Sequence, residues 1–472
     1  MKTIKCLLIG VLATAMSTPL MAQDNKTTID AIAKVIKADP EAAKDQVKDV
    51  YKKNKKNAEV LVGIGRAYFE AKDTANAKIY ANYAIKANKN YGAGYILLGD
   101  IEVVKDDGGA AAGWYQQAIY FDPKNPDGYL KYANIYRGRS PEEAVSKLNE
   151  LRAQRPDIAV DALAARILYS SNRLEQSLDY YDKVTDKSKL EDLDITNYAT
   201  EAWMLQKREK SLEMARYGLT RNARKAAWNR LVFYNLTDMG QTEEALKYAD
   251  ALFNASDSAK ISGFDYTYYG TALKNAKQYD KAIEMLKKAL AENKDNADLL
   301  NSNKKSLSDA YAAMEDFDNA TLYYEEYLKN VQKTTASDMA GLATIYTNMA
   351  AKLTGDQKKE ALKKADAVYA QLGEKFPENI DFANFMRARV NSNLDPETKE
   401  GLAKPFYEAI VNSLADKSDR DRADNARLSE AYRYLGYYYL LKDDKATADG
   451  YWNKVLEIDP NNATAKQALG IQ

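Results

Sequence analysis

The feature that most constrains the fold is a spacing of small and large residues that recurs along most of the chain. Gly65 is followed by Tyr68, Ala77 and Ala84, and the same spacing returns in the same phase from Gly99 onwards. Units with this spacing start near residues 58, 92, 126, 158, 192, 226, 263, 301, 336, 379 and 429. Most units are about 34 residues long, so the chain is predicted to be a stack of similar supersecondary units, each packing only on its neighbours.

Each unit is predicted to be two amphipathic helices joined by a polar turn. Within residues 266–276, aromatic and small residues recur at spacings of three and four, which places them on one face of a helix. Prolines that stop a helix follow the predicted second helix of several units: Pro123, Pro156, Pro377 and Pro460. Small residues at fixed positions let helices approach closely, and aromatic residues fill the remaining space. Many of the 35 tyrosines are therefore predicted to be core residues rather than ligand contacts.

The repeating unit resembles the tetratricopeptide repeat, a helix-turn-helix unit. The last unit carries the family's pattern of bulky, small and aromatic residues best: Tyr432, Leu435, Gly436, Tyr439, Ala448, Trp452, Val455 and Pro460. The resemblance covers roughly residues 58–462. It implies an all-α, right-handed α-α superhelical solenoid of about eleven such repeats.

The N-terminal residues 1–22 are predicted to be a secretory signal peptide. Lys2 and Lys5 precede a short apolar run, and Ala22 ends the segment at a plausible cleavage site. The run is too short to cross a membrane as a helix. The single cysteine, Cys6, lies inside this segment, so the mature chain is expected to have no disulfide. We therefore expect an exported protein, located in the periplasm of a Gram-negative bacterium and without an integral membrane segment after cleavage.

The rest of the chain divides into four predicted segments. Residues 23–57 are a helical extension whose second helix starts at residues 39–41, and residues 58–414 are the main solenoid. Residues 415–428 are a charged connector, the expected hinge or boundary before the last repeat, and residues 429–472 hold the last repeat and a C-terminal capping helix.

The composition excludes several kinds of chemistry. The chain has no histidine, which excludes Ser-His-Asp and Cys-His nucleophile systems and histidine-based zinc sites. Lys plus Arg and Asp plus Glu both total 68, so no basic surface for nucleic acid is expected. No motif places two carboxylates on a rigid site. The prediction is a protein that is not an enzyme and has no catalytic residues, no metal site and no cofactor.

Binding residues follow from the resemblance, which implies that positions 2, 5, 9, 12 and 13 of each first helix face a concave groove. The candidates at these positions are Arg66, Asn134, Arg166, Trp203, Arg230, Tyr234, Lys274, Arg387, Arg433 and Tyr437. Arginine with interspersed aromatics suits an extended or acidic peptide. The alternative is a solvated face whose arginines pair with aspartates of the same chain. The family's two-carboxylate clamp is not expected, because Lys305 has Asp309 where the clamp requires Asn.

Three functions remain open at this point. The first is a non-catalytic periplasmic scaffold or adaptor that binds a protein or extended peptide in its groove. The second is capture of envelope glycans by exposed aromatics such as Trp203, Tyr234 and Tyr437. The third, a hydrolase, is disfavoured because no catalytic constellation is evident.

Overall fold

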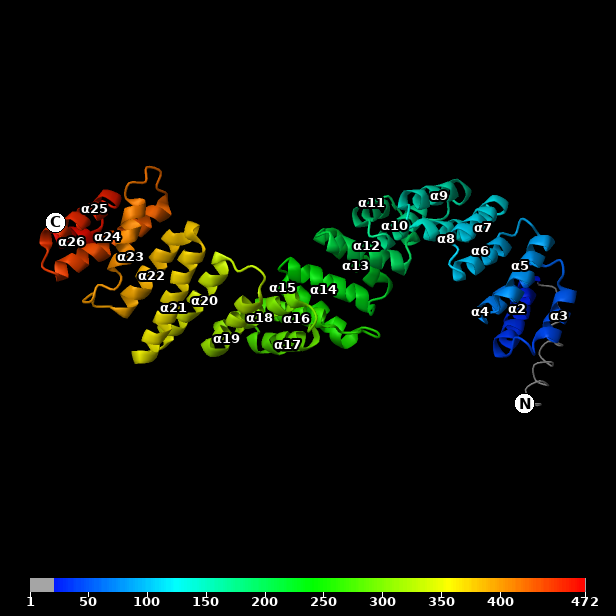
Figure 1. Cartoon of the computed structure of the whole chain (residues 1–472), viewed down its shortest axis with the longest axis horizontal. Coiled ribbons are helices and arrows are strands. Elements are labelled where there is room, and N and C mark those ends of the chain that lie inside the picture. Colours follow the sequence, from blue (N-terminus) through cyan, green and yellow to red (C-terminus); the bar gives the residue numbers. More distant parts are fainter. Residues whose placement is uncertain (1–20, 472) are drawn as a thin grey trace. The chain divides into compact units, whose positions relative to one another are not determined.

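The computed structural model describes residues 21–471, in which every regular element is a helix (Figure 1). The chain forms two compact units, unit 1 (Met1–Asn235) and unit 2 (Leu236–Gln472). The helices that begin in unit 1 are α2 (Met21–Ala38), α3 (Lys44–Lys53), α4 (Ala58–Glu70), α5 (Thr74–Ala87), α6 (Ala93–Val104), α7 (Gly108–Phe121), α8 (Pro126–Tyr136), α9 (Pro141–Gln154), α10 (Val160–Ser170), α11 (Leu174–Asp182), η1 (Lys187–Lys189), α12 (Asp192–Met204), α13 (Arg208–Arg221) and α14 (Ala226–Asp238). The helices of unit 2 are α15 (Thr242–Asp250), η2 (Ala251–Ala255), α16 (Gly263–Asn275), α17 (Tyr279–Glu292), α18 (Ala297–Ala313), α19 (Phe317–Asn330), α20 (Ala336–Lys352), α21 (Gly355–Lys375), η3 (Pro377–Asn379), α22 (Ile380–Leu394), α23 (Lys404–Leu414), α24 (Arg422–Leu441), α25 (Lys445–Ile458) and α26 (Ala463–Leu469).

The predicted all-α solenoid of about eleven helix-turn-helix repeats is confirmed. Within each unit helices pack as consecutive pairs, α4 with α5 through α12 with α13 in unit 1, and α16 with α17 through α24 with α25 in unit 2. The predicted signal peptide, residues 1–22, lies outside the described residues except for residues 21 and 22, which begin α2. Export therefore stays a prediction.

Close packing explains the small residue of each unit. A Cβ atom added to Gly65 would lie 2.6 Å from a methyl carbon of Leu97, and one added to Gly99 would lie 2.4 Å from the Tyr115 ring. In the last repeat, a Cβ on Gly436 would lie 2.8 Å from the Trp452 ring. Glycine is needed at these positions because the neighbouring aromatic or aliphatic side chain occupies the space of a methyl group.

The turn between the two helices has the same backbone geometry in most units. One residue in the turn adopts a left-handed conformation, with φ between 57° and 71° at Lys72, Asp106, Asn172, Gln206, Gly240, Lys277, Glu315 and Asp443. The next amide closes the turn on the first helix, as Asp73 N does on Tyr68 O at 2.9 Å. Seven of these eight residues are not glycine, and such residues ordinarily avoid a positive φ. The packing of the two helices therefore imposes the left-handed conformation at the turn.

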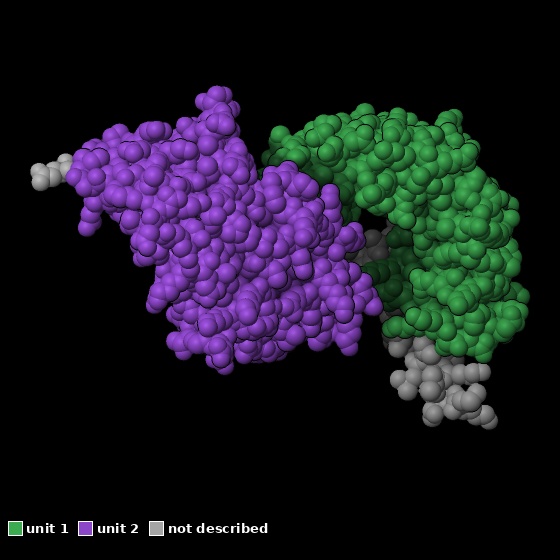
Figure 2. Space-filling model, turned by 60° about the vertical axis from the view of Figure 1, so that its left-hand side comes forward, with its two compact units in different colours: residues 1–235 green, residues 236–472 purple. Residues whose placement is uncertain are grey.

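Unit 1 curves toward its first helices. Each first helix contacts the first helix of the next pair, α4 with α6, α6 with α8, α8 with α10 and α10 with α12. Among the described helices of unit 1, successive second helices pack less closely. The first helices therefore line the concave side, and Figure 2 shows unit 1, in green, as a curved body.

Two predicted boundaries differ from the structure. Helix α3 begins at Lys44, because the Asp39 carboxylate accepts hydrogen bonds from the amides of Glu41 and Ala42 and holds residues 39–43 in a turn. Helix α24 begins at Arg422, inside the predicted connector, because Asp421 and Asp424 form a capping box. Leu414 and Leu428, on either side of the shortened connector, lie in one core cluster. The hinge there stays a prediction.

Candidate functional site

The concave side of unit 1 holds a groove of about 670 Å³ between α4, α6 and α8. It is lined by Arg66, Phe69, Glu70, Asp100, Val103, Val104, Tyr115, Lys131, Asn134, Ile135 and Arg137. Most of these residues occupy the positions that the resemblance assigns to the binding face, and they come from three consecutive repeats. We call this the unit 1 groove.

The charges on one wall of the groove are paired within the chain. Asp100, which is 8% exposed, accepts from Lys131 Nζ at 2.7 Å and from the Tyr115 hydroxyl at 2.8 Å. Arg66 Nη1 lies 3.4 Å from its other oxygen. Because both cations already face a carboxylate, this wall offers little free positive charge to a ligand.

The same pairing links first helices of successive repeats elsewhere. Arg166 on α10 donates two hydrogen bonds to the buried carboxylate of Asp194 on α12, at 2.5 and 2.7 Å. Three further pairs join neighbouring helices: Lys274 with Asp309 at 2.8 Å, Lys305 with Asp338 at 2.7 Å, and Arg387 with Asp366 at 3.0 Å. These basic residues stabilise contacts between neighbouring helices of the solenoid. This agrees with the alternative prediction from the sequence, in which basic residues of the inner face pair with aspartates of the same chain.

The other wall of the groove is apolar: Val103 and Val104 are exposed and Phe69 is half-buried, and the row that they begin continues beyond the groove. Phe69, Val103, Tyr169 and Trp203 occupy the same position near the end of α4, α6, α10 and α12. Val103 is 45% exposed and its neighbour Val104 is 66% exposed. We call these residues, with Val104 and Met204, the apolar row. At the equivalent position of α8 the row is interrupted by Arg137, which is exposed.

Comparison with known families decides the identity of the repeat. A tetratricopeptide repeat model matches residues 266–296, which cover α16 and α17. The same helix pairing recurs along the chain, and the same turn geometry recurs in most of the repeats. The chain is a tetratricopeptide repeat protein.

Other similarities are partial. The C-terminal part of a repeat protein from Cytophaga hutchinsonii is 22% identical, with a TM-score of 0.41, over 65% of this chain and 99% of that one. A tetratricopeptide repeat protein from Parabacteroides merdae is 17% identical, with a TM-score of 0.34, over 52% of this chain and 98% of that one. The RxLR effector protein SFI4 of Phytophthora infestans is 37% identical over 112 residues, 22% of this chain. The match spans only 33% of that relative's length.

The predicted site residues do not form one site in this tetratricopeptide repeat protein. Arg66 and Asn134 line the unit 1 groove. Arg166, Lys274 and Arg387 are held in the intramolecular pairs described above. The half-buried Arg230 lies on α14, and the exposed Arg433 and Tyr437 lie on α24 of unit 2. Their roles in binding stay predictions.

The prediction that Tyr234 is an exposed aromatic is wrong. Tyr234 is 4% exposed, and its ring centroid lies 5.7 Å from that of Trp203. Trp203 is itself half-buried, with the guanidinium of Arg208 5.5 Å from its ring centroid. The repeat pattern could not distinguish these cases, because burial here depends on the neighbouring helix. Tyr437, at 45% exposure, is the exposed member of the proposed glycan-binding set.

The sequence reasoning missed the most exposed residues of the apolar row. Val103, Val104 and Met204 end their helices and were not chosen, because apolar residues at helical spacing are more often core. Their position within the repeat, beside Phe69 and Trp203, is the signal that could have identified them.

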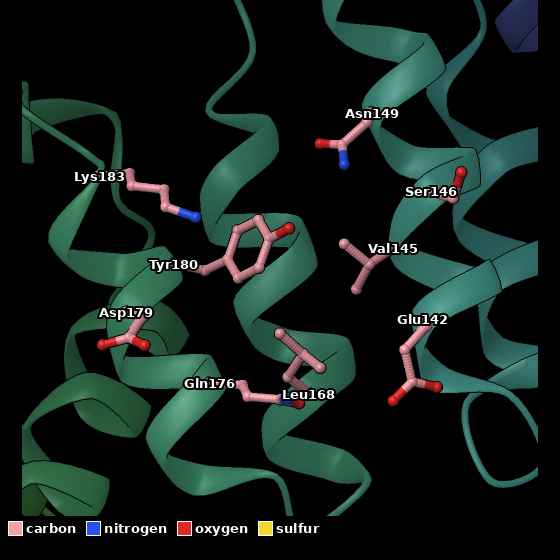
Figure 3. Close-up of a pocket in the computed structure, with 9 residues that line it drawn as sticks. All are labelled: Glu142, Val145, Ser146, Asn149, Leu168, Gln176, Asp179, Tyr180 and Lys183. Atoms are coloured by element: carbon pink, nitrogen blue, oxygen red, sulfur yellow. The ribbon is translucent and has the colours of Figure 1, made fainter.

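A second, smaller cleft of about 330 Å³ lies between α9, α10 and α11 (Figure 3). Val145, Leu168 and Tyr180 form its apolar part, and Lys183 Nζ lies 3.8 Å from the Tyr180 ring centroid.

In residues 21–471 no helix is long and apolar enough to cross a membrane. Nor does this described part contain a cluster of three or more cysteine, aspartate or glutamate side chains arranged for a metal ion.

The paired aspartates give the solenoid an acid-sensitive contact. Burial alone would raise the pKa of Asp338, but hydrogen bonds from Lys305, Thr335 and Tyr327 outweigh burial and hold it at about 2. Because this pKa is below the value of about 3.9 in an unfolded chain, the contact is fully present above pH 4 and is lost as the pH falls toward 2. Asp338→Asn is therefore expected to lower the free energy of unfolding by about 2 kcal/mol at pH 7 and to flatten its decline below pH 4. Urea titrations between pH 2 and pH 7 measure both effects, and an unchanged acid slope would contradict this account.

Proposed function

We propose that this protein is a non-catalytic scaffold, exported to the periplasm, that binds a protein or an extended peptide in the unit 1 groove. The tetratricopeptide fold is in general a protein-interaction scaffold. The observation that carries the proposal is the contrast between the two walls of the groove: Arg66 and Lys131 are already paired with Asp100, whereas Val103 and Val104 are exposed to solvent. Exposed valines on a concave surface are typical of an interaction site rather than of a free surface.

Crosslinking in cells tests this proposal, with mass spectrometry of the captured partners. Val104→Asp places a charge on the apolar row and is expected to lower partner recovery several-fold, because binding would then bury an unpaired carboxylate. Ile79→Asp is the matched control, because Ile79 is also exposed, at 44%, but lies on the second helix α5. Equal loss in both variants would contradict groove binding. The same spectra report export, because the mature N-terminal peptide should begin at Gln23.

Glycan capture is not favoured over this proposal. It needs several exposed aromatic rings on one surface, whereas Tyr234 is buried and Tyr437 belongs to the other unit.

A further inference from the structure

We propose that one edge of unit 1 is a docking surface for the phosphate headgroups of an anionic lipid bilayer. This edge is separate from the unit 1 groove, so the inference goes beyond the proposed function and does not depend on it. Its evidence is a set of unpaired lysines on three neighbouring loops, the position of these lysines relative to the helix ends, and exposed tyrosines beside them.

The edge is formed by the loops that join a second helix to the next first helix, at residues 54–57, 88–92 and 122–125. These loops lie side by side. A pocket lined by Lys56 and Tyr91 connects the first loop with the second, and Gly92 N donates to Asp122 Oδ2 at 3.0 Å between the second and the third. The residues of the unit 1 groove lie instead toward the C-terminal ends of α4, α6 and α8. The loop edge is therefore a distinct surface of unit 1.

Six exposed lysines lie on these loops or in the helical turn before them. We call them the basic edge: Lys53, Lys55, Lys56, Lys86, Lys89 and Lys124. Their neighbour Lys52 pairs with Asp49 at 3.1 Å, but none of the six forms an ion pair with a carboxylate of residues 21–471. The equal totals of positive and negative residues in the whole chain therefore hide a local excess of positive charge.

The carboxylates close to this edge are fewer, and two of them are already engaged. Glu59 accepts from Asn25 Nδ2 at 2.7 Å, and Asp122 accepts the Gly92 amide described above. Asp127, in the first turn of α8, is exposed. Residues 74–99 contain no aspartate or glutamate at all. The edge therefore keeps a net positive charge.

Helix stability does not account for the basic edge. Cations are favourable at the C-terminal end of a helix and unfavourable at its N-terminal end. Lys53 and Lys86 lie in the last turns of α3 and α5, where the helix dipole favours them. Lys56 and Lys124, in contrast, lie just before the first residues of α4 and α8, where the dipole disfavours them. Like charges gathered on adjacent loops oppose folding and attract anions, which indicates a role in binding.

The chemistry of lysine favours a surface of many mobile phosphates. A lysine ammonium is a compact, hydrated charge on a flexible stem, whereas an arginine guanidinium binds one planar anion through a fixed pair of hydrogen bonds. All six residues of the basic edge are lysines. Each lysine near an anionic leaflet strengthens membrane binding about fivefold.

Exposed tyrosines at the same edge favour a bilayer over a linear polyanion. Tyr120, the penultimate residue of α7, is 77% exposed, and Tyr83, on α5 beside Lys86, is 38% exposed. A tyrosine ring has an apolar body and a polar hydroxyl, and such rings are enriched at the headgroup level of membranes. A polysaccharide or nucleic acid in water offers no interface of this kind.

The test is co-sedimentation of the purified full chain with lipid vesicles. Binding is expected with vesicles of equal parts phosphatidylglycerol and phosphatidylcholine, and much weaker binding with phosphatidylcholine alone. About 0.5 M NaCl should remove the difference, because salt screens exposed charges. Equal binding to both kinds of vesicle at low salt, or to neither, would overturn the inference.

Charge reversal identifies the surface. Lys55→Glu, Lys86→Glu and Lys89→Glu together are expected to weaken binding to the anionic vesicles at least about hundredfold. The matched control makes the same charge change at three exposed lysines of unit 2, with Lys281→Glu, Lys359→Glu and Lys363→Glu. Residues 1–22 are the same in all proteins compared, so the N-terminal segment contributes equally. Equal weakening by both triple variants would overturn the assignment of the basic edge.

Tyr120 separates a bilayer from other polyanions. Tyr120→Ser is expected to weaken vesicle binding several-fold, and Tyr120→Trp to retain it, because both aromatic rings favour the membrane interface. Neither variant should change binding of dextran sulfate, a linear polyanion, or thermal unfolding, because the side chain is exposed. Dextran sulfate binding as strong as vesicle binding, with no effect of Tyr120→Ser on either, would overturn the lipid assignment.

Discussion

Replacing Glu201 by glutamine is expected to stabilise the protein by several kcal/mol at pH 8 and to remove most of the fall in stability between about pH 4.5 and pH 8. Glu201 lies on α12, is 0% exposed, and neither of its carboxylate oxygens has a hydrogen-bond partner. Burial raises its pKa to about 8 and outweighs the lowering effect of Ser177; Asp182 raises the pKa further and Lys207 lowers it. A charged carboxylate in this place would be uncompensated.

The direction of the effect follows from proton linkage. The folded chain holds the Glu201 proton up to about pH 8, whereas the unfolded chain releases it near pH 4.5. The free energy of unfolding therefore falls as the pH rises from about 4.5 to about 8 and is constant above that range. This difference between the folded and unfolded pKa corresponds to at most about 5 kcal/mol of unfolding free energy. A protein with a neutral amide at this position would not lose that free energy as the pH rises.

The next repeat shows how an amide fits here. At the equivalent position, Asn235 donates to Ser211 Oγ at 2.7 Å, and Ser211 Oγ donates in turn to Ala199 O at 2.7 Å. Ser177 makes the corresponding bond to Ala165 O at 2.9 Å and faces Glu201. Urea unfolding of wild type and Glu201→Gln at pH 5, 6.5 and 8 measures the effect. Glu209→Gln, an exposed residue of α13, is the control and should change stability little. Parallel pH profiles for wild type and Glu201→Gln would contradict the account.

Arg166→Ala is expected to lower the free energy of unfolding by about 3 kcal/mol, because it leaves the Asp194 carboxylate buried without its cation. Asp194 is 1% exposed and retains only the Glu191 amide, at 2.8 Å, and the Tyr181 hydroxyl, at 3.3 Å. Hydrogen exchange should locate the loss in α10 and α12, because repeats contact only their neighbours. Arg433→Ala, an exposed arginine of α24, is the control and should be near neutral. A stable Arg166→Ala protein with unchanged exchange in α12 would contradict the structural role.

This second prediction also affects how the groove is tested. Loss of binding after Arg166→Ala would be expected from the damaged contact between repeats alone. Val104 and Arg137 are better probes, because both are exposed and neither takes part in an ion pair of the described chain.

The sequence determined the repeat and its phase because close packing leaves a local signature. Gly65, Gly99 and Gly436 each face a bulky side chain that excludes a Cβ, and Pro123 and Pro460 follow second helices as predicted. Such signals recur at the same position in unit after unit, so even degenerate repeats were placed correctly.

The tertiary structure alone decided which polar and aromatic groups remain available. Arg66, Arg166 and Arg137 look alike in the repeat pattern, yet the first two face aspartates of a neighbouring repeat and the third does not. Tyr234 and Tyr437 likewise occupy the same position in their repeats, but one is buried and the other exposed. The physical reason is that helix formation and pairing depend on residues within one repeat. Burial and charge pairing depend instead on the facing helix of the next repeat, which the pattern of a single repeat does not contain.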